Sequence, residues 1–117
     1  MKKKKDINYL VLTPTRKYDS EDREDGFINI LIPRYTDFFF GKLLQPRLKN
    51  KYIRANLDEY GSAVWQEING STNVEQIGNK LENRFGERIQ PVLPRLTTFL
   101  TQIYDAGFIT FNELERK

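Results

Sequence analysis

The chain has 117 residues, of which 38% are hydrophobic and 30% are charged, a composition typical of a globular domain and not of a disordered segment. It has no cysteine and no histidine, which excludes disulfides and thiolate chemistry and removes the commonest general base and metal ligand. Residues 1–57 carry 13 basic and 7 acidic side chains, whereas residues 58–117 carry 6 basic and 9 acidic ones. A basic front half can meet an acidic peptide, a nucleic acid or nothing at all.

Residues 1–6 (MKKKKD) are charged and are predicted to form a disordered basic tail. They are not followed by the apolar segment of a signal peptide, and no apolar run approaches the length of a membrane span. A cytoplasmic protein without a membrane partner is therefore predicted. The chain has no glycine-rich phosphate loop, metal-ligand cluster or nucleophile motif, so neither a cofactor nor an enzymatic activity is expected.

Short apolar runs in the first half of the chain predict strands separated by polar loops. Residues 7–13 (INYLVLT) are predicted to form a strand that ends at Pro14, and residues 27–32 (FINILI) a second strand that is closed by Pro33. Between these two runs, residues 18–26 hold five carboxylates and one aromatic side chain. Because such a segment can bury little apolar surface, it is predicted to be a mobile acidic loop.

The stretch before the helices contains one ambiguous run and one clear strand signal. Residues 38–40 (FFF) suit either a strand or a helix, and residues 46–51 are predicted to be a basic connector. Residues 52–57 (YIRANL) alternate between apolar and polar side chains, which predicts a half-buried strand. Its two predicted faces are Ile53, Ala55 and Leu57 on one side and Tyr52, Arg54 and Asn56 on the other.

The only tryptophan lies in the first predicted helix. Asp58 is a suitable N-cap for this helix, and Gly70 follows it as a residue that tolerates a positive φ. Val64, Trp65 and Ile68 share one face at helical spacing. Trp65 is therefore predicted to be a core residue, and the functional site is expected around this helix and not in it.

The second predicted helix starts with a capping box over residues 72–75 (TNVE), with Thr72 as the cap. Gly86 is predicted to end this helix. Its apolar stripe consists of Val74, Ile77, Leu81 and Phe85.

The third predicted helix begins near Pro91 or Pro94, because proline is tolerated in a first turn. Gly107 is predicted to end it, and Phe108 and Ile109 to fold back as an apolar closure. The main apolar stripe of this helix consists of Leu96, Leu100 and Ile103, and a neighbouring stripe consists of Val92, Arg95, Phe99 and Gln102.

The order of these elements predicts an α+β, winged-helix-like fold, with a small antiparallel β-sheet followed by three α-helices. A single domain is expected over residues 1–117. Within it, residues 7–57 hold strands and loops and residues 58–109 form the three-helix part.

The helical part of the chain resembles the PqqD family, which is named for the coenzyme PQQ synthesis protein D. The resemblance covers residues 57–109 and depends on the order and spacing of the shared residues. These residues are Leu57, Asp58, Glu59, Gly61, Trp65, Asn69, Gly70, Val74, Ile77, Leu81, Phe99, Leu100, Gly107, Phe108 and Ile109.

The resemblance implies a non-catalytic peptide chaperone, also called a RiPP recognition element. Such a protein binds the leader of a ribosomally made precursor peptide and presents it to a modifying enzyme, often a radical SAM protein, in PQQ or other RiPP biosynthesis. The leader adds as a strand to the sheet edge and rests against the third helix. In this chain the implied peptide-binding residues are Tyr52, Ile53, Arg54, Ala55, Asn56, Val92, Arg95, Phe99 and Gln102.

Physical chemistry supports that implication, because strand addition needs an open edge for affinity and side-chain pockets for selectivity. Arg54 and Arg95 are candidates to pair with acidic leader residues, although each also suits a solvated surface. Phe99 suits either an apolar groove or the core.

Two alternative functions remain at the level of sequence. A winged helix suggests DNA binding, but residues 91–106 contain a single basic residue, Arg95, so the base-reading helix is poorly supplied and nucleic acid is not the expected partner. The other alternative is a structural scaffold subunit of an enzyme complex.

Overall fold

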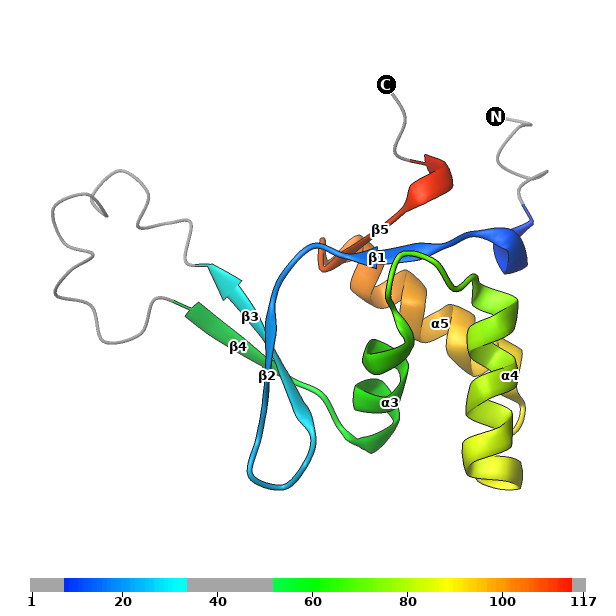
Figure 1. The fold of residues 1–117 in the computed structure, drawn as a ribbon, viewed down its shortest axis with the longest axis horizontal. Coiled ribbons are helices and arrows are strands. Elements are labelled where there is room, and N and C mark those ends of the chain that lie inside the picture. Colours follow the sequence, from blue (N-terminus) through cyan, green and yellow to red (C-terminus); the bar gives the residue numbers. More distant parts are fainter. Residues whose placement is uncertain (1–7, 34–51, 115–117) are drawn as a thin grey trace, which may run out of the picture. The chain divides into compact units, whose positions relative to one another are not determined.

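The computed structural model describes residues 8–33 and 52–114. The described residues form two small antiparallel sheets and three α-helices (Figure 1), which confirms the predicted α+β, winged-helix-like fold. They divide into two compact units. Of the described residues, 8–17 and 60–114 are called the helical unit, and 18–33 and 52–59 the sheet unit. The single domain over residues 1–117 stays a prediction.

The sheet unit is a three-stranded antiparallel sheet in the order β2-β3-β4. Its strands are β2 (Ser20–Asp22), β3 (Ile28–Pro33) and β4 (Tyr52–Asn56). The register places Ile30 of β3 between Ser20 of β2 and Ala55 of β4. The strands predicted over residues 27–32 and 52–57 are therefore confirmed.

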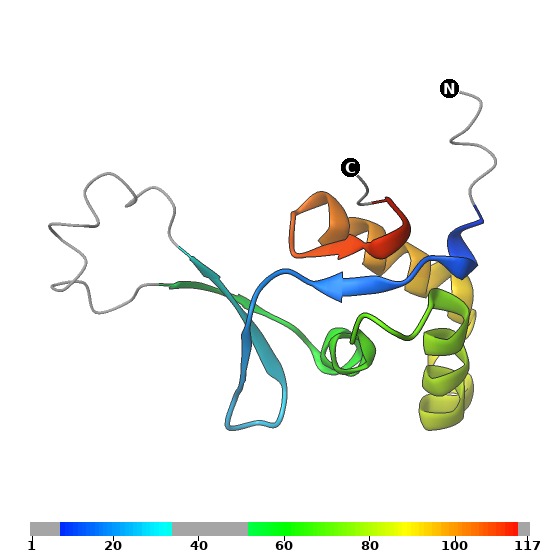
Figure 2. The ribbon, with the colours of Figure 1, turned by 45° about the horizontal axis from the view of Figure 1, so that its top comes forward.

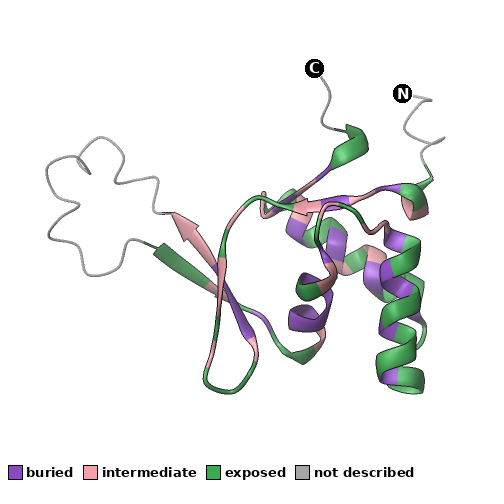
Figure 3. Cartoon of the chain, in the orientation of Figure 1, coloured by how far each residue is buried: buried purple, intermediate pink, exposed green. Residues whose placement is uncertain are grey.

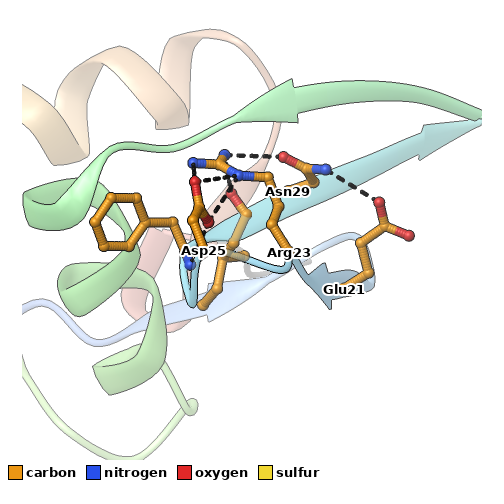
Figure 4. Close-up of polar contacts among 6 residues, drawn as sticks. Glu21, Arg23, Asp25 and Asn29 are labelled. Atoms are coloured by element: carbon orange, nitrogen blue, oxygen red, sulfur yellow. Dashed lines mark hydrogen bonds and ion pairs between the residues drawn. The ribbon is translucent and has the colours of Figure 1, made fainter.

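The mobile acidic loop predicted over residues 18–26 is wrong for Ser20–Asp22, which pair with β3. Figure 4 shows that Glu21 and Asp25, two of the acidic side chains of this segment, have polar partners. Asp25 accepts the amide of Phe27 and forms an ion pair of 3.0 Å with Arg23. Acidic side chains with local partners permit strand pairing, and residue composition alone does not reveal those partners.

The helices are α3 (Glu59–Glu67), α4 (Val74–Phe85) and α5 (Val92–Asp105), and all of their residues except Glu59 belong to the helical unit. The predicted apolar stripes of all three helices are buried, as the purple segments of Figure 3 show. Trp65 has no exposed surface, which confirms it as a core residue. The buried stripe residues are Val64, Trp65 and Ile68 near α3, Val74, Ile77, Leu81 and Phe85 on α4, and Leu96, Leu100 and Ile103 on α5.

The helix ends confirm the predicted glycine stops and correct one cap. Gly70, Gly86 and Gly107 all have positive φ angles, of 82°, 64° and 87°. The capping box of α4 lies one residue after the predicted one, because Asn73 and not Thr72 is the N-cap and Gln76 returns the hydrogen bond. Asparagine and threonine both serve as N-caps, so the sequence did not decide which of these two adjacent residues caps α4.

Two chain segments that are far apart in sequence form the second sheet. β1 (Pro14–Arg16) pairs antiparallel with β5 (Ile109–Phe111), and both Figures 1 and 2 show the two strands side by side. The strand predicted over residues 7–13 is wrong, because Tyr9–Val11 is a 3-10 turn and Pro14 starts the strand instead of ending it. Proline suits the first residue of a strand, since its missing amide is not needed there.

Polar contacts hold the ends of this sheet in place. The side chain of Glu113, in the 3-10 turn Asn112–Leu114, accepts the amide and the hydroxyl of Thr13 at 2.7 and 2.8 Å. Arg16 donates to the carbonyl oxygen of Trp65 at 2.6 Å, and its guanidinium carbon lies 5.2 Å from the centroid of the indole ring. These contacts tie the segment before the sheet unit to the helices after it.

The predicted basic tail at residues 1–6, the run at residues 38–40 and the connector at residues 46–51 lie outside the described residues. Within residues 8–33 and 52–114, the structure contains no helix that is long and apolar enough to cross a membrane.

Candidate functional site

β4 is an edge strand: it pairs with β3 on one side, and no strand in the described part of the chain pairs with its other side. One hydrogen bond shows which residues of this segment bond to β3: the Leu57 amide donates to the Ile28 carbonyl at 2.9 Å. In an antiparallel ladder, every second residue bonds to the same neighbour. Ala55 and Ile53 therefore bond toward β3. The main-chain groups of the alternate residues point to the open edge, and these are Tyr52, Arg54 and Asn56.

The side chains of β4 follow the predicted alternation but are more exposed than predicted. Ile53 and Ala55 lie opposite Ile32 and Ile30 on one face of the sheet. Ile53 is nevertheless 54% exposed, and Tyr52 is 39% exposed. An edge strand lacks a neighbour on one side, so its side chains lose the cover that a central strand receives. An edge with exposed apolar side chains favours pairing with another chain.

Arg54 has a carboxylate partner within the sheet. Its Nε donates to Oε2 of Glu21 at 2.7 Å, and the same oxygen accepts the Nδ2 group of Asn29 at 3.0 Å. The hydrogen bonds from Asn29 and from Arg54 lower the pKa of Glu21. The sequence offered no signal for this pair, because the two residues are 33 positions apart and lie on the two outer strands.

α5 carries an open hollow of about 370 Å³. Arg95, Phe99 and Gln102 of the predicted second stripe line it, whereas Val92 is only 7% exposed and is not part of the lining. The sequence analysis missed the other lining residues, Tyr60, Pro94 and Thr98. Helical spacing was the available signal, since Tyr60 lies four residues before Val64, and Pro94, Thr98 and Gln102 are four residues apart.

Two aromatic side chains line the hollow, and the guanidinium of Arg95 lies beside one of them. The rings of Tyr60 and Phe99 pack edge to face with centroids 5.9 Å apart. The guanidinium carbon of Arg95 lies 5.0 Å from the centroid of the Tyr60 ring, and its Nη1 donates to the Arg88 carbonyl at 3.3 Å. Phe99 is half-buried, so part of its ring remains available. Such a hollow suits an apolar or aromatic side chain.

A small antiparallel sheet with an open edge, followed by three helices of which the last carries an apolar hollow, defines a winged-helix-like class of binding domain. Within this class, the model of the family described as Coenzyme PQQ synthesis protein D (PqqD) matches residues 43–109, more than half of the chain. The chain therefore belongs to the PqqD family, as its sequence resemblance predicted, and members of this family are non-catalytic. No curated protein and no solved structure matches the chain.

Proposed function

We propose that this chain binds the leader of a ribosomally made precursor peptide and presents it to a modifying enzyme such as a radical SAM protein. The role is non-catalytic, and the pathway is PQQ synthesis or the synthesis of another modified peptide. Because the ligand is made by ribosomes, the encounter takes place in the cytoplasm. Family membership supports this class of function.

The observation that carries the proposal is the open edge of β4. The main-chain groups of Tyr52, Arg54 and Asn56 face it, and a leader segment can add there as a further strand. The main-chain hydrogen bonds supply affinity that any extended leader can gain, and the side chains of β4 set which leader residues are preferred. Ile53 and Ala55 would then contact alternate side chains of the leader on the apolar face.

The hollow on α5 supplies the second proposed contact surface. Its aromatic walls at Tyr60 and Phe99 suit an apolar leader side chain, and Arg95 and Gln102 add polar groups at its rim. Val92 is nearly covered, so the proposal depends on the other three members of the predicted stripe. The edge and the hollow belong to different compact units, and each has a separate test.

α5 favours a peptide over DNA as the ligand. Its residues Val92–Asp105 include one basic side chain, Arg95, whose guanidinium lies over the ring of Tyr60. A helix that reads DNA needs several basic or amide side chains toward the groove. Steep loss of binding with added salt would identify a nucleic-acid ligand instead.

The proposal is tested by adding a candidate leader peptide to the ¹⁵N-labelled chain and following the amide resonances. We expect the largest shifts at β4 and around the α5 hollow. Shifts that cluster on α4 would contradict both proposed surfaces.

Phe99→Ala should weaken binding by about 1 to 3 kcal/mol if Phe99 anchors a leader side chain. The matched control is Leu93→Ala, since Leu93 is also on α5 and 38% exposed but does not line the hollow. Equal losses from the two variants would remove the hollow from the binding site while leaving the β4 edge to its own test.

A further inference from the structure

The Arg54 side chain does not extend toward the open edge of β4. Its Nε lies 2.7 Å from a carboxylate oxygen of Glu21, which is on β2 at the opposite edge of the sheet. Neighbouring strands are about 4.8 Å apart, so a side chain of β4 that reaches a residue of β2 lies over β3. The charge of Arg54 is thus held back from the position where an added strand would lie.

Glu21 is fixed in place independently of Arg54. Its carboxylate accepts a hydrogen bond from the side-chain amide of Asn29 (Figure 4), and Asn29 is itself only 7% exposed. The Oδ1 atom of Asn29 in turn accepts Nη1 of Arg23 at 3.0 Å, and Arg23 is paired with Asp25. A carboxylate that is already ordered loses little further freedom when it binds a cation, so this network favours the retracted position of Arg54.

We propose that Glu21 determines the charge preference of the β4 edge, an inference that rests on the proposed binding of a leader strand there. Because Glu21 neutralises Arg54, the leader residue opposite Arg54 is uncharged and polar and not acidic. The leader residues on either side of it lie opposite Ile53 and Ala55 and are apolar, since those two side chains share the apolar face of β4. The substrate class is therefore a leader segment of the pattern apolar, uncharged polar, apolar.

Two electrostatic effects produce this preference. An acidic side chain opposite Arg54 would have to compete with Glu21 for the same guanidinium, and it would bring a second negative charge close to Glu21. An uncharged polar side chain avoids both effects. Removing the charge of Glu21 leaves Arg54 without its carboxylate, and an acidic leader residue then gains an ion pair.

The test uses two short synthetic peptides that differ at one position, with centres Val-Ser-Val and Val-Asp-Val and the same Gly and Ser flanks. Binding to the full chain is measured by fluorescence anisotropy. The variants are Glu21→Gln, which keeps the length of the side chain, and Arg54→Gln. Asp22→Asn is the matched control, because it removes a charge from the same strand and Asp22 is exposed on the opposite face.

The wild-type chain should bind the Ser-centred peptide at least as tightly as the Asp-centred one. Glu21→Gln should reverse the order and bind the Asp-centred peptide about three to five times more tightly. Arg54→Gln should have the opposite effect and lower the affinity for the Asp-centred peptide by about threefold. Glu21 then lacks its cationic partner, and its negative charge repels the Asp side chain. Asp22→Asn should keep the wild-type order.

The inference is overturned if the wild-type chain already prefers the Asp-centred peptide, or if Glu21→Gln leaves the order unchanged. In both cases the peptides still bind, so the proposed function survives. If neither peptide binds the wild-type chain or Glu21→Gln, the proposed strand addition and this inference fail together.

Discussion

The two compact units of this chain differ in how much apolar side chain remains exposed. The helical unit buries large apolar side chains completely, with Trp65, Ile77 and Leu96 showing no exposed surface. In the sheet unit, an outer strand keeps Ile53 54% exposed, and a row of polar side chains connects its three strands through Glu21 and Asn29. Core packing tolerates little change, whereas an open edge with main-chain groups to spare can accept a ligand. In the helical unit the buried stripes are needed for folding and the α5 hollow is the proposed contact surface, whereas in the sheet unit the edge strand β4 is itself available for binding.

The largest effect is expected from Trp65→Ala in the helical unit. Removing a fully buried indole should lower the free energy of unfolding by about 3 to 5 kcal/mol. Its ring nitrogen has no hydrogen-bond partner within the described ranges, so the loss reports on packing. Denaturant melts provide the measurement, with Trp65→Phe as a milder control. A loss below about 1 kcal/mol would show that the indole is not a core group.

A smaller effect is expected at the start of α4. Asn73→Ala should cost about 1 kcal/mol, because the Asn73 side chain accepts the Gln76 amide at the helix N-terminus. Thr72→Ala should stay within about 0.5 kcal/mol of the wild type. The two variants, compared by thermal unfolding, separate the observed cap from the cap that the sequence predicted. A larger loss of stability in Thr72→Ala than in Asn73→Ala would show that Thr72 is the N-cap.

Acid should weaken the contact of Glu113 with Thr13. Burial acts to raise the pKa of Glu113, but the hydrogen bonds from the amide and hydroxyl of Thr13 outweigh it and lower the pKa in the folded state. Because the folded pKa is depressed, the stabilisation is present above the unfolded pKa of about 4.3 and is lost as the pH falls through the folded value. Between about pH 5 and pH 3, unfolding free energy should fall more in the wild type than in Glu113→Gln. Parallel pH profiles would show that Glu113 makes no such contribution.

The smallest effect on stability is expected at Ile53 in the sheet unit. Ile53→Thr should change the free energy of unfolding by less than about 0.5 kcal/mol, because the side chain is more than half exposed and threonine also favours strands. The same variant should lower the affinity for a leader peptide if the Ile53 side chain contacts the peptide bound at the open edge. A stability loss above about 1 kcal/mol would mean that this strand belongs to the core and would remove the contrast between the two units.

The accuracy of the sequence predictions depended on how local each signal was. The stripe of Val74, Ile77 and Leu81 and the stop at Gly86 are contained within one helix, and the structure confirms them. The acidic hairpin strand at Ser20–Asp22 was missed because its strand partner lies in β3, and because its Glu21 carboxylate meets Asn29 only once the hairpin has formed. For the candidate site, the strand Tyr52–Asn56 and part of the α5 face were predicted, but Tyr60 was not.

The sequence by itself determined the three helices, their buried faces, the strands β3 and β4 and the PqqD family, because periodic apolar residues and glycine stops act over a few neighbouring positions. Only the tertiary structure decided which short segments pair. Pro14–Arg16 meets Ile109–Phe111 across most of the chain, and Arg54 meets Glu21 across an intervening strand. Strands of three residues carry too little pattern to name their partners. For β1 and β5, the pairing is set by the packed helices of the helical unit, which bring the two segments together, and by the hydrogen bonds available there.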